Sequence, residues 1–153
     1  MIDPHGVSQR GLRRAFESLE APTDLTGDYR ASYPGGVLPV IAPLGLRLLG
    51  LRNWHGKRFA RREDGSWRAV NLVGAHRELT ETLPMLVSRE DSWVDRLPVA
   101  VATYPADTRK PWPWVRDELR VWDGGVLLGM TFVDLPGARR APGMPFVLTR
   151  GSQ

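Results

Sequence analysis

The segment from Trp54 to Phe59 carries the densest group of chemically useful side chains in the sequence. In an extended strand, side chains alternate between two faces, so His55, Lys57 and Phe59 would share one face. Trp54 and Arg58 would lie on the other face. If the first face points inward, it supplies a proton-transfer group, a positive charge and an aromatic wall, which suits a ligand with an apolar body and an acidic or enolate head. The alternative is that His55 and Lys57 lie on the outer surface while Phe59 covers a neighbour.

Two carboxylates, Asp117 and Glu81, fall on strand faces that are otherwise apolar. Their neighbours on those faces are Val115, Leu119 and Val121 for Asp117, and Leu79, Leu83 and Met85 for Glu81. A buried acid is costly unless it is paired or used, and burial raises its pKa, so the two could form a general acid/base couple. The alternative is that each forms a structural ion pair with a base such as Lys57 or Arg58, an arrangement that often imitates an active site.

Several other chemistries lack support in the sequence. The chain has no cysteine, which excludes thiol catalysis and cysteine-based zinc sites. His5, His55 and His76 are far apart and form no paired metal-ligand spacing, so no metal site is expected, although His55 or His76 could be an axial haem ligand. Neither a glycine-rich phosphate loop nor a nucleophile elbow occurs.

Length and composition describe an ordinary globular protein. The 153 residues, 42% hydrophobic and 25% charged, predict a single domain over 1–153 with a substantial core. The net charge is +4, but the arginines are scattered among acids, so no nucleic-acid partner is expected. The first residues show no basic-then-apolar signal layout, which favours a cytoplasmic location. The oligomeric state stays open.

Short alternating segments separated by turn residues recur along the chain and predict about eight strands without a βαβ rhythm. The expected strands cover 25–33, 54–60, 67–73, 79–88, 98–104, 114–122, 126–133 and 146–150. Asp-Gly pairs at Asp64 and Asp123 favour tight hairpins. This pattern predicts the all-β class, with an antiparallel closed β-barrel.

Two segments differ from the strand pattern. Ser8 can cap a short helix over 8–20, in which Leu12, Phe16 and Leu19 recur at helical spacing. The apolar segment 37–51 is broken by proline and glycine and is too short to span a bilayer. It could plug one barrel end, act as a lid over a cavity mouth, or contact a membrane surface.

Ring closure would place the first strand beside the last one. Gly27 and Tyr29 in the first strand could then meet Arg150 in the last, with the guanidinium across the Tyr29 ring. A closed barrel with a hollow interior favours binding of a small hydrophobic or amphipathic molecule, with Tyr29, Tyr104 and Met130 as further candidate contacts. The alternative is a cofactor-independent isomerase or cyclase that acts on an apolar metabolite.

The sequence also resembles the bacterial GXWXG-type calycin-like family, from about Ala15 to Arg150. The segments that carry the resemblance are Ala15–Leu19, Leu25–Arg30, Trp54–Phe59, Val115–Arg120, Leu127–Met130 and Phe146–Arg150. The resemblance implies a lipocalin-like barrel and, by likeness to nitrobindins, haem binding as a further candidate function. Here Tyr29 stands where the family has its name-giving tryptophan, and Ala31 replaces the second glycine.

Overall fold

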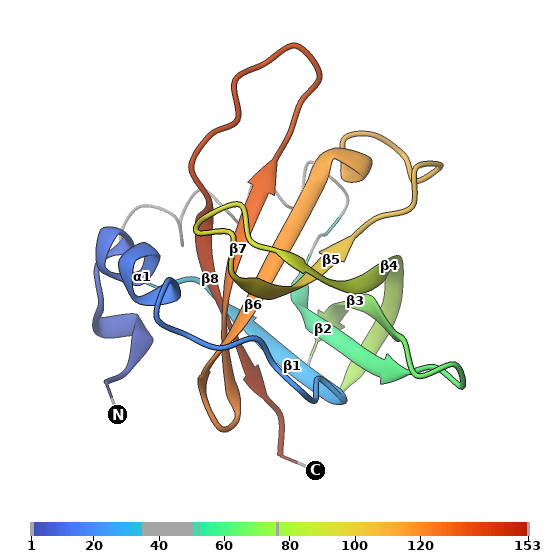
Figure 1. Cartoon of the computed structure of the whole chain (residues 1–153). Coiled ribbons are helices and arrows are strands. Elements are labelled where there is room, and N and C mark those ends of the chain that lie inside the picture. The colour runs from blue at the N-terminus through green and yellow to red at the C-terminus, as the bar shows by residue number, and fades with distance from the viewer. Residues whose placement is uncertain (1, 35–50, 52, 76, 153) are drawn as a thin grey trace.

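Eight strands close into one antiparallel barrel in the structure, a computed structural model that describes residues 2–34, 51, 53–75 and 77–152 (Figure 1). Each strand pairs with the next one, and the last returns to the first. The strands are β1 (Gly27–Ser32), β2 (Trp54–Arg61), β3 (Trp67–Ala75), β4 (Glu78–Asp91), β5 (Pro98–Thr103), β6 (Val115–Asp123), β7 (Val126–Val133) and β8 (Met144–Arg150). The predicted all-β closed barrel is therefore confirmed.

The β1–β8 contact closes the ring, and Tyr29 lies opposite Arg150 in its ladder. The Arg150 guanidinium donates to the Tyr29 hydroxyl from Nε at 3.0 Å and from Nη2 at 2.6 Å. Its Cζ lies 5.3 Å from the ring centroid, so the two residues meet as predicted. Tyr29 is buried and packs edge-on against Phe59, which joins the closure to the core.

One α-helix, α1 (Gln9–Phe16), precedes the barrel and lies against its outer face (Figure 1). The Ser8 side chain caps its start by accepting from the Gly11 N–H. The expected extent of 8–20 was too long, because the chain leaves the helix after Phe16. The Phe16 carbonyl accepts a hydrogen bond from the buried Arg120 guanidinium, 2.8 Å away, at this point. A helix C-terminus favours such a cation.

The apolar side chains form two clusters, one inside the barrel and one beneath α1. The interior cluster includes Tyr29, Phe59, Met85, Ala102, Tyr104, Trp112, Leu119, Phe146 and Leu148. The outer cluster joins Leu12 and Phe16 of α1 to Val99, Val101, Leu128, Met130, Phe132 and Val147. Strands beneath the helix are thus buried on both faces. Short 3-10 turns occur at Pro4–Gly6 and Trp112–Trp114.

Three irregularities interrupt the ladders between described strands. One lies beside the β6–β7 turn, between Val121 and Asp123, and the other two bear on the barrel interior. In the β2–β3 pair, Trp54 lies opposite Val73 and Gly56 opposite Leu72, which leaves His55 as the extra residue. In the β3–β4 pair, Ala69 lies opposite Met85 and Asn71 opposite Thr82. The chain between Thr82 and Met85 holds Leu83 at φ 48, in the left-handed region. Beyond each of these two bulges, residues that simple alternation places inside the barrel point outward, and those that it places outside point inward.

The predicted lid or plug segment, 37–51, lies outside the described residues except for Leu51, which is buried in the interior cluster. Among the described residues, no helix is long and apolar enough to cross a membrane.

Candidate functional site

A chain of polar side chains crosses the barrel interior, although the surrounding cluster is apolar. Lys57 is 1% exposed, and its Nζ lies 3.1 Å from Asp117 Oδ2 and 3.0 Å from Asn71 Oδ1. Asn71 Oδ1 also accepts from the Trp54 indole N–H at 3.1 Å. On its other side, Asn71 Nδ2 donates to the Tyr104 hydroxyl at 2.9 Å. Asn71 therefore joins an ion pair, an indole and a phenol in one hydrogen-bonded network.

Second partners hold this network in place. Thr131 donates its hydroxyl hydrogen to Asp117 Oδ1 at 2.7 Å. Asn71 Nδ2 also donates to the main-chain carbonyl of Leu83, 3.1 Å away, at the β4 bulge. The Lys57 ammonium lies 3.2 Å from Met85 Sδ as well. No buried polar side-chain atom in the described part of the chain lacks a hydrogen-bond partner, so the network is saturated.

Burial and charge act on the pKa values of the groups in this network. Burial alone lowers the pKa of the Lys57 ammonium, but interactions with Tyr104 and Asp117 outweigh it, and the net pKa is raised. Burial raises the pKa of Tyr104, and Asp117 adds to the increase while Lys57 opposes it. The pKa of Tyr33, a further interior phenol, is raised as well, first by burial and then by the charge of Asp117. At physiological pH, Lys57 is therefore charged because of its partners, and Tyr104 and Tyr33 are neutral chiefly because they are buried.

These shifts predict a loss of stability at alkaline pH. In the unfolded chain, tyrosine and lysine release protons near pH 10.0 and 10.5, whereas the folded chain retains those protons to higher pH. The unfolded state then binds fewer protons, so the free energy of unfolding falls as the pH rises above about 10. Urea denaturation between about pH 8 and pH 11 measures this slope. Tyr104→Phe should make it shallower; an unchanged slope would contradict the contribution of Tyr104.

The two predicted carboxylates do not form a couple. Asp117 points into the barrel and pairs with Lys57, whereas Glu81 lies on the outer surface with a side chain 54% exposed. Arg58 also lies outside and binds Asp28 and Glu81, each at 2.7 Å. The general acid/base couple was wrong because the β4 bulge turns Glu81 outward while Met85 stays inward. Both acids occur in ion pairs, as the alternative interpretation expected.

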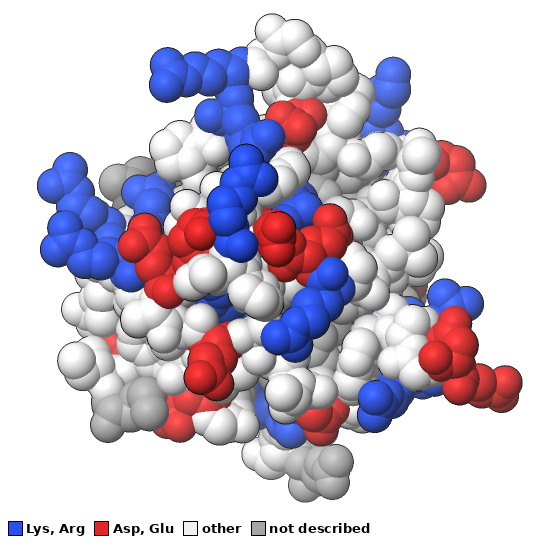
Figure 2. Space-filling model, in the orientation of Figure 1, with Lys and Arg blue, Asp and Glu red and all other residues white. Residues whose placement is uncertain are grey.

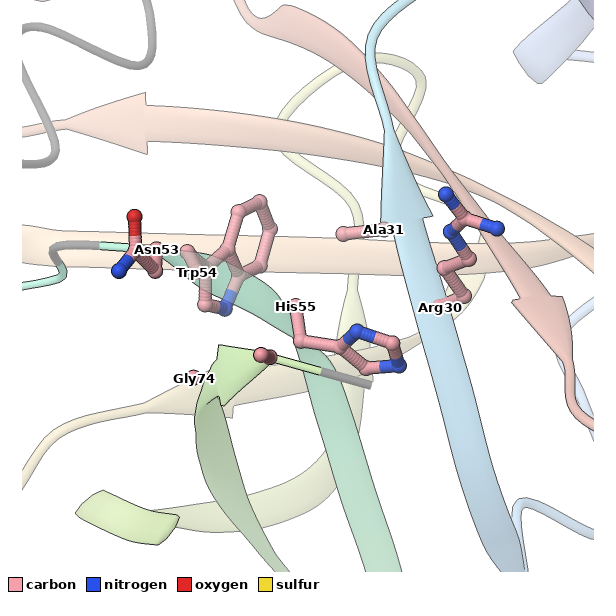
Figure 3. A pocket seen from close by; sticks show the side chains of 7 residues that line it. Arg30, Ala31, Asn53, Trp54, His55 and Gly74 are labelled. Carbon is pink, nitrogen blue, oxygen red and sulfur yellow. The ribbon is translucent and has the colours of Figure 1, made fainter. Parts of the chain in front are cut away.

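The β2 bulge similarly reverses the expected faces of Trp54 and His55. Trp54 turns inward, where its ring lies 5.5 Å from Lys57 Nζ and 6.3 Å from the Phe146 ring centroid. His55 turns the other way, toward β1 (Figure 3). The expectation that His55 shares a face with Lys57 and Phe59 was therefore wrong. Arg58, a candidate contact for the polar head of a ligand, lies on the outer surface and is already paired with Asp28 and Glu81. A single inserted residue accounts for the reversal of Trp54 and His55.

A pocket of about 440 Å³ lies where β1, β2 and β3 meet at this end of the barrel (Figure 3). Its lining consists of Arg30, Ala31, Asn53, Trp54, His55, Gly74 and Ala75. Trp54 belongs both to the pocket wall and to the buried network, so it connects the two. Arg30 is exposed and forms no ion pair with any described residue.

The remaining predicted ligand contacts divide between the two faces of the sheet. Tyr29, Phe59 and Tyr104 belong to the interior cluster. Met130 was misplaced, because it lies in the outer cluster beneath α1 and cannot line the interior. His76 lies outside the described residues. Within the described ranges, no group of three potential metal ligands comes together.

Sequence reasoning missed the roles of Asn71 and Arg30. Asn71 joins the buried network, but an asparagine in a strand carries no distinguishing pattern. Arg30 follows Tyr29 in an alternating strand, where it looks like any outer residue; only the position of the β1 end beside Trp54 gives it a place in the pocket. Neither position could be recognised without the pairing of strands.

A scan against protein-family models and searches of curated proteins and of solved structures found no match. The resemblance to the GXWXG-type calycin-like family stays a prediction.

Proposed function

We propose that this barrel binds a small amphipathic acid at the pocket beside Trp54. The observation that carries the proposal is the double role of Trp54, which forms one wall of the pocket and donates its indole N–H to the buried Asn71. The ring is thereby held in one orientation by a saturated hydrogen-bond network. A binding surface that is already ordered loses little conformational entropy when the ligand arrives.

The lining supplies the two kinds of contact that such a ligand needs. The Trp54 ring with Ala31 and Ala75 gives an apolar surface. Arg30, exposed and without a described counter-ion, gives a charge that can bind a carboxylate through paired hydrogen bonds. His55 lies beside it as a second polar group (Figure 3). Lys57 has a structural role here, because its ammonium is already occupied by Asp117 and Asn71.

Arg30→Gln should weaken binding of a carboxylate without changing binding of the matching alcohol. We expect the decanoate affinity to fall about tenfold, because a charge-assisted hydrogen bond is lost, while decanol binds as before. Tryptophan fluorescence and two-dimensional NMR titrations of the full chain measure both ligands. Arg68→Gln, an exposed arginine on β3 outside this pocket, is the matched control.

Three results would reject the proposal. Decanoate could leave the amide signals of the pocket residues unmoved, Arg30→Gln could bind decanoate as tightly as the original chain, or the control could lose as much affinity. Native mass spectrometry of gently purified protein provides an independent search for the natural ligand.

A further inference from the structure

A second pocket lies on the outside of the barrel, between α1, the turn after β4 and the residues that lead into β8. Its volume is about 540 Å³. The lining consists of Arg10, Arg13, Arg14, Glu17, Trp93, Val94, Met130, Phe132, Pro142 and Gly143. None of these residues lines the pocket beside Trp54, so this groove, named here the α1 groove, is a separate feature.

The rim of the α1 groove is positively charged. Three arginines of α1 line it against one acid, Glu17. Arg13 is held in place because its Nε donates to the Gly143 carbonyl at 2.8 Å, whereas Arg10 and Arg14 form no ion pair with any described residue. Figure 2 shows basic side chains projecting from the edge of the molecule where Figure 1 places α1.

The floor of the groove is apolar and consists of Trp93, Val94, Met130 and Phe132. Arg116 and Arg140 contact the Trp93 ring, with Cζ atoms 4.4 Å and 3.5 Å from the ring centroid. The Phe132 ring packs edge-on at 5.4 Å, and the main-chain N–H of Trp93 donates to Glu118 Oε1 at 2.8 Å. Glu118 is fully buried and paired with Arg116, so it fixes the main chain at Trp93, while the ring is packed by Arg116, Arg140 and Phe132.

We propose that the α1 groove binds an acidic peptide segment of a partner protein, with one aliphatic or aromatic residue inserted between carboxylates. The apolar floor would receive the anchor side chain, and the arginine rim would bind the flanking acids through charge-assisted hydrogen bonds. The volume lies within the range of about 300–1,000 Å³ that is typical of binding pockets, enough for a few side chains. In size and charge, the groove is complementary to a short acidic motif.

Other anionic partners fit these observations less well. A nucleic-acid backbone would use the arginines but not the recessed apolar floor. A membrane surface would require apolar side chains that project outward, whereas Met130 and Phe132 are buried at the base of the groove. The groove lies outside the barrel, so the proposal is independent of the ligand proposed for the pocket beside Trp54.

Fluorescence anisotropy with the full chain tests the proposal. The probe is a fluorescein-labelled peptide of sequence Glu-Asp-Leu-Phe-Asp-Glu; one control peptide has lysine in place of each acid, and another has serine in place of Leu-Phe. We expect the acidic probe to bind with a Kd on the order of 10–100 µM and both controls to bind at least about tenfold more weakly. Affinity should fall as salt rises, because the rim is exposed.

Charge reversal locates the binding site. Arg10→Glu combined with Arg14→Glu should weaken the acidic probe at least about tenfold, whereas Arg68→Glu combined with Arg89→Glu, the same charge change on β3 and β4, should leave it unchanged. Equal binding of either control peptide, or equal loss in both double variants, would overturn the proposal. Competition by phosphatidylglycerol vesicles that depends on Arg10 and Arg14 would assign the groove to membranes instead. If the first double variant does not fold, the peptide series on the original chain still decides.

Discussion

Lys57→Met should lower the free energy of unfolding by about 3–5 kcal/mol, because removing one member of a buried ion pair leaves the other charge unpaired. Asp117 is 4% exposed and would keep only its hydrogen bond from Thr131 among the contacts described above. Asn71 Oδ1 would lose one of its two donors in the same variant. A loss of this size is a large fraction of the total stability of an ordinary domain, about 5–15 kcal/mol. Urea denaturation followed by tryptophan fluorescence measures it.

Substitution of Asp117, the partner of Lys57 in the buried ion pair, tests whether the two charges depend on each other. Asp117→Leu alone should cost a similar amount, whereas the combined Lys57→Met and Asp117→Leu variant should recover most of the loss, because apolar pairs of similar volume can replace buried ion pairs. Losses that simply add in the combined variant would show that the two charges do not depend on each other. Single losses below about 1 kcal/mol would contradict the buried pair itself.

Gly56→Ala should open the barrel at the β1–β2 contact and cost about 3 kcal/mol or more. Gly56 lies opposite Arg30 in this ladder, and an added Cβ would overlap the main-chain carbonyl oxygen of Tyr29. It would also lie 3.0 Å from the Ala31 amide nitrogen. These are backbone atoms, which cannot rotate aside as a side chain can. Relief of the overlap therefore requires β1 to move away from β2.

Gly124→Ala provides the matched control for Gly56→Ala, because no atom lies within 4 Å of the added Cβ in the β6–β7 turn. Its stability should change by less than about 0.5 kcal/mol. Circular dichroism, thermal denaturation and the accessibility of β1 amides to exchange compare the two variants. A Gly56→Ala protein with the original melting temperature would show that β1 and β2 do not approach each other so closely.

The strands and their tight turns could be predicted from the sequence because both depend on local patterns, and the ring closure could be predicted because a sheet that closes on itself pairs its first strand with its last. Alternation and Asp-Gly turns located the strands, and the antiparallel closure placed Tyr29 beside Arg150. The bulges could not be predicted, because an inserted residue such as His55 carries no signal of its own. Each bulge inverts every face assignment beyond it, which is why Trp54 and Glu81 were placed on the wrong sides.

The inward and outward faces of β7 could not be told apart from the sequence, for a different reason. Leu127 points into the barrel, whereas Leu128, Met130 and Phe132 lie beneath α1. Both faces are apolar because the helix covers the outer one. The spacing of apolar residues therefore does not show which face of β7 points into the barrel. The outer side of β6 is covered as well. Phe16 of α1 lies on Arg120, and Ser92 and Trp93 of the turn after β4 lie on Glu118, so both residues are buried despite their charge.

Every strand of the ring has a hydrogen-bonded neighbour on each side. An open sheet ends in a row of unpaired main-chain groups, and through that row it can recruit an extended peptide or a second copy of itself by strand addition. The pairing of β1 with β8 removes such a template from these two strands. The binding proposed above for the barrel end and the α1 groove would accordingly use side chains rather than strand addition.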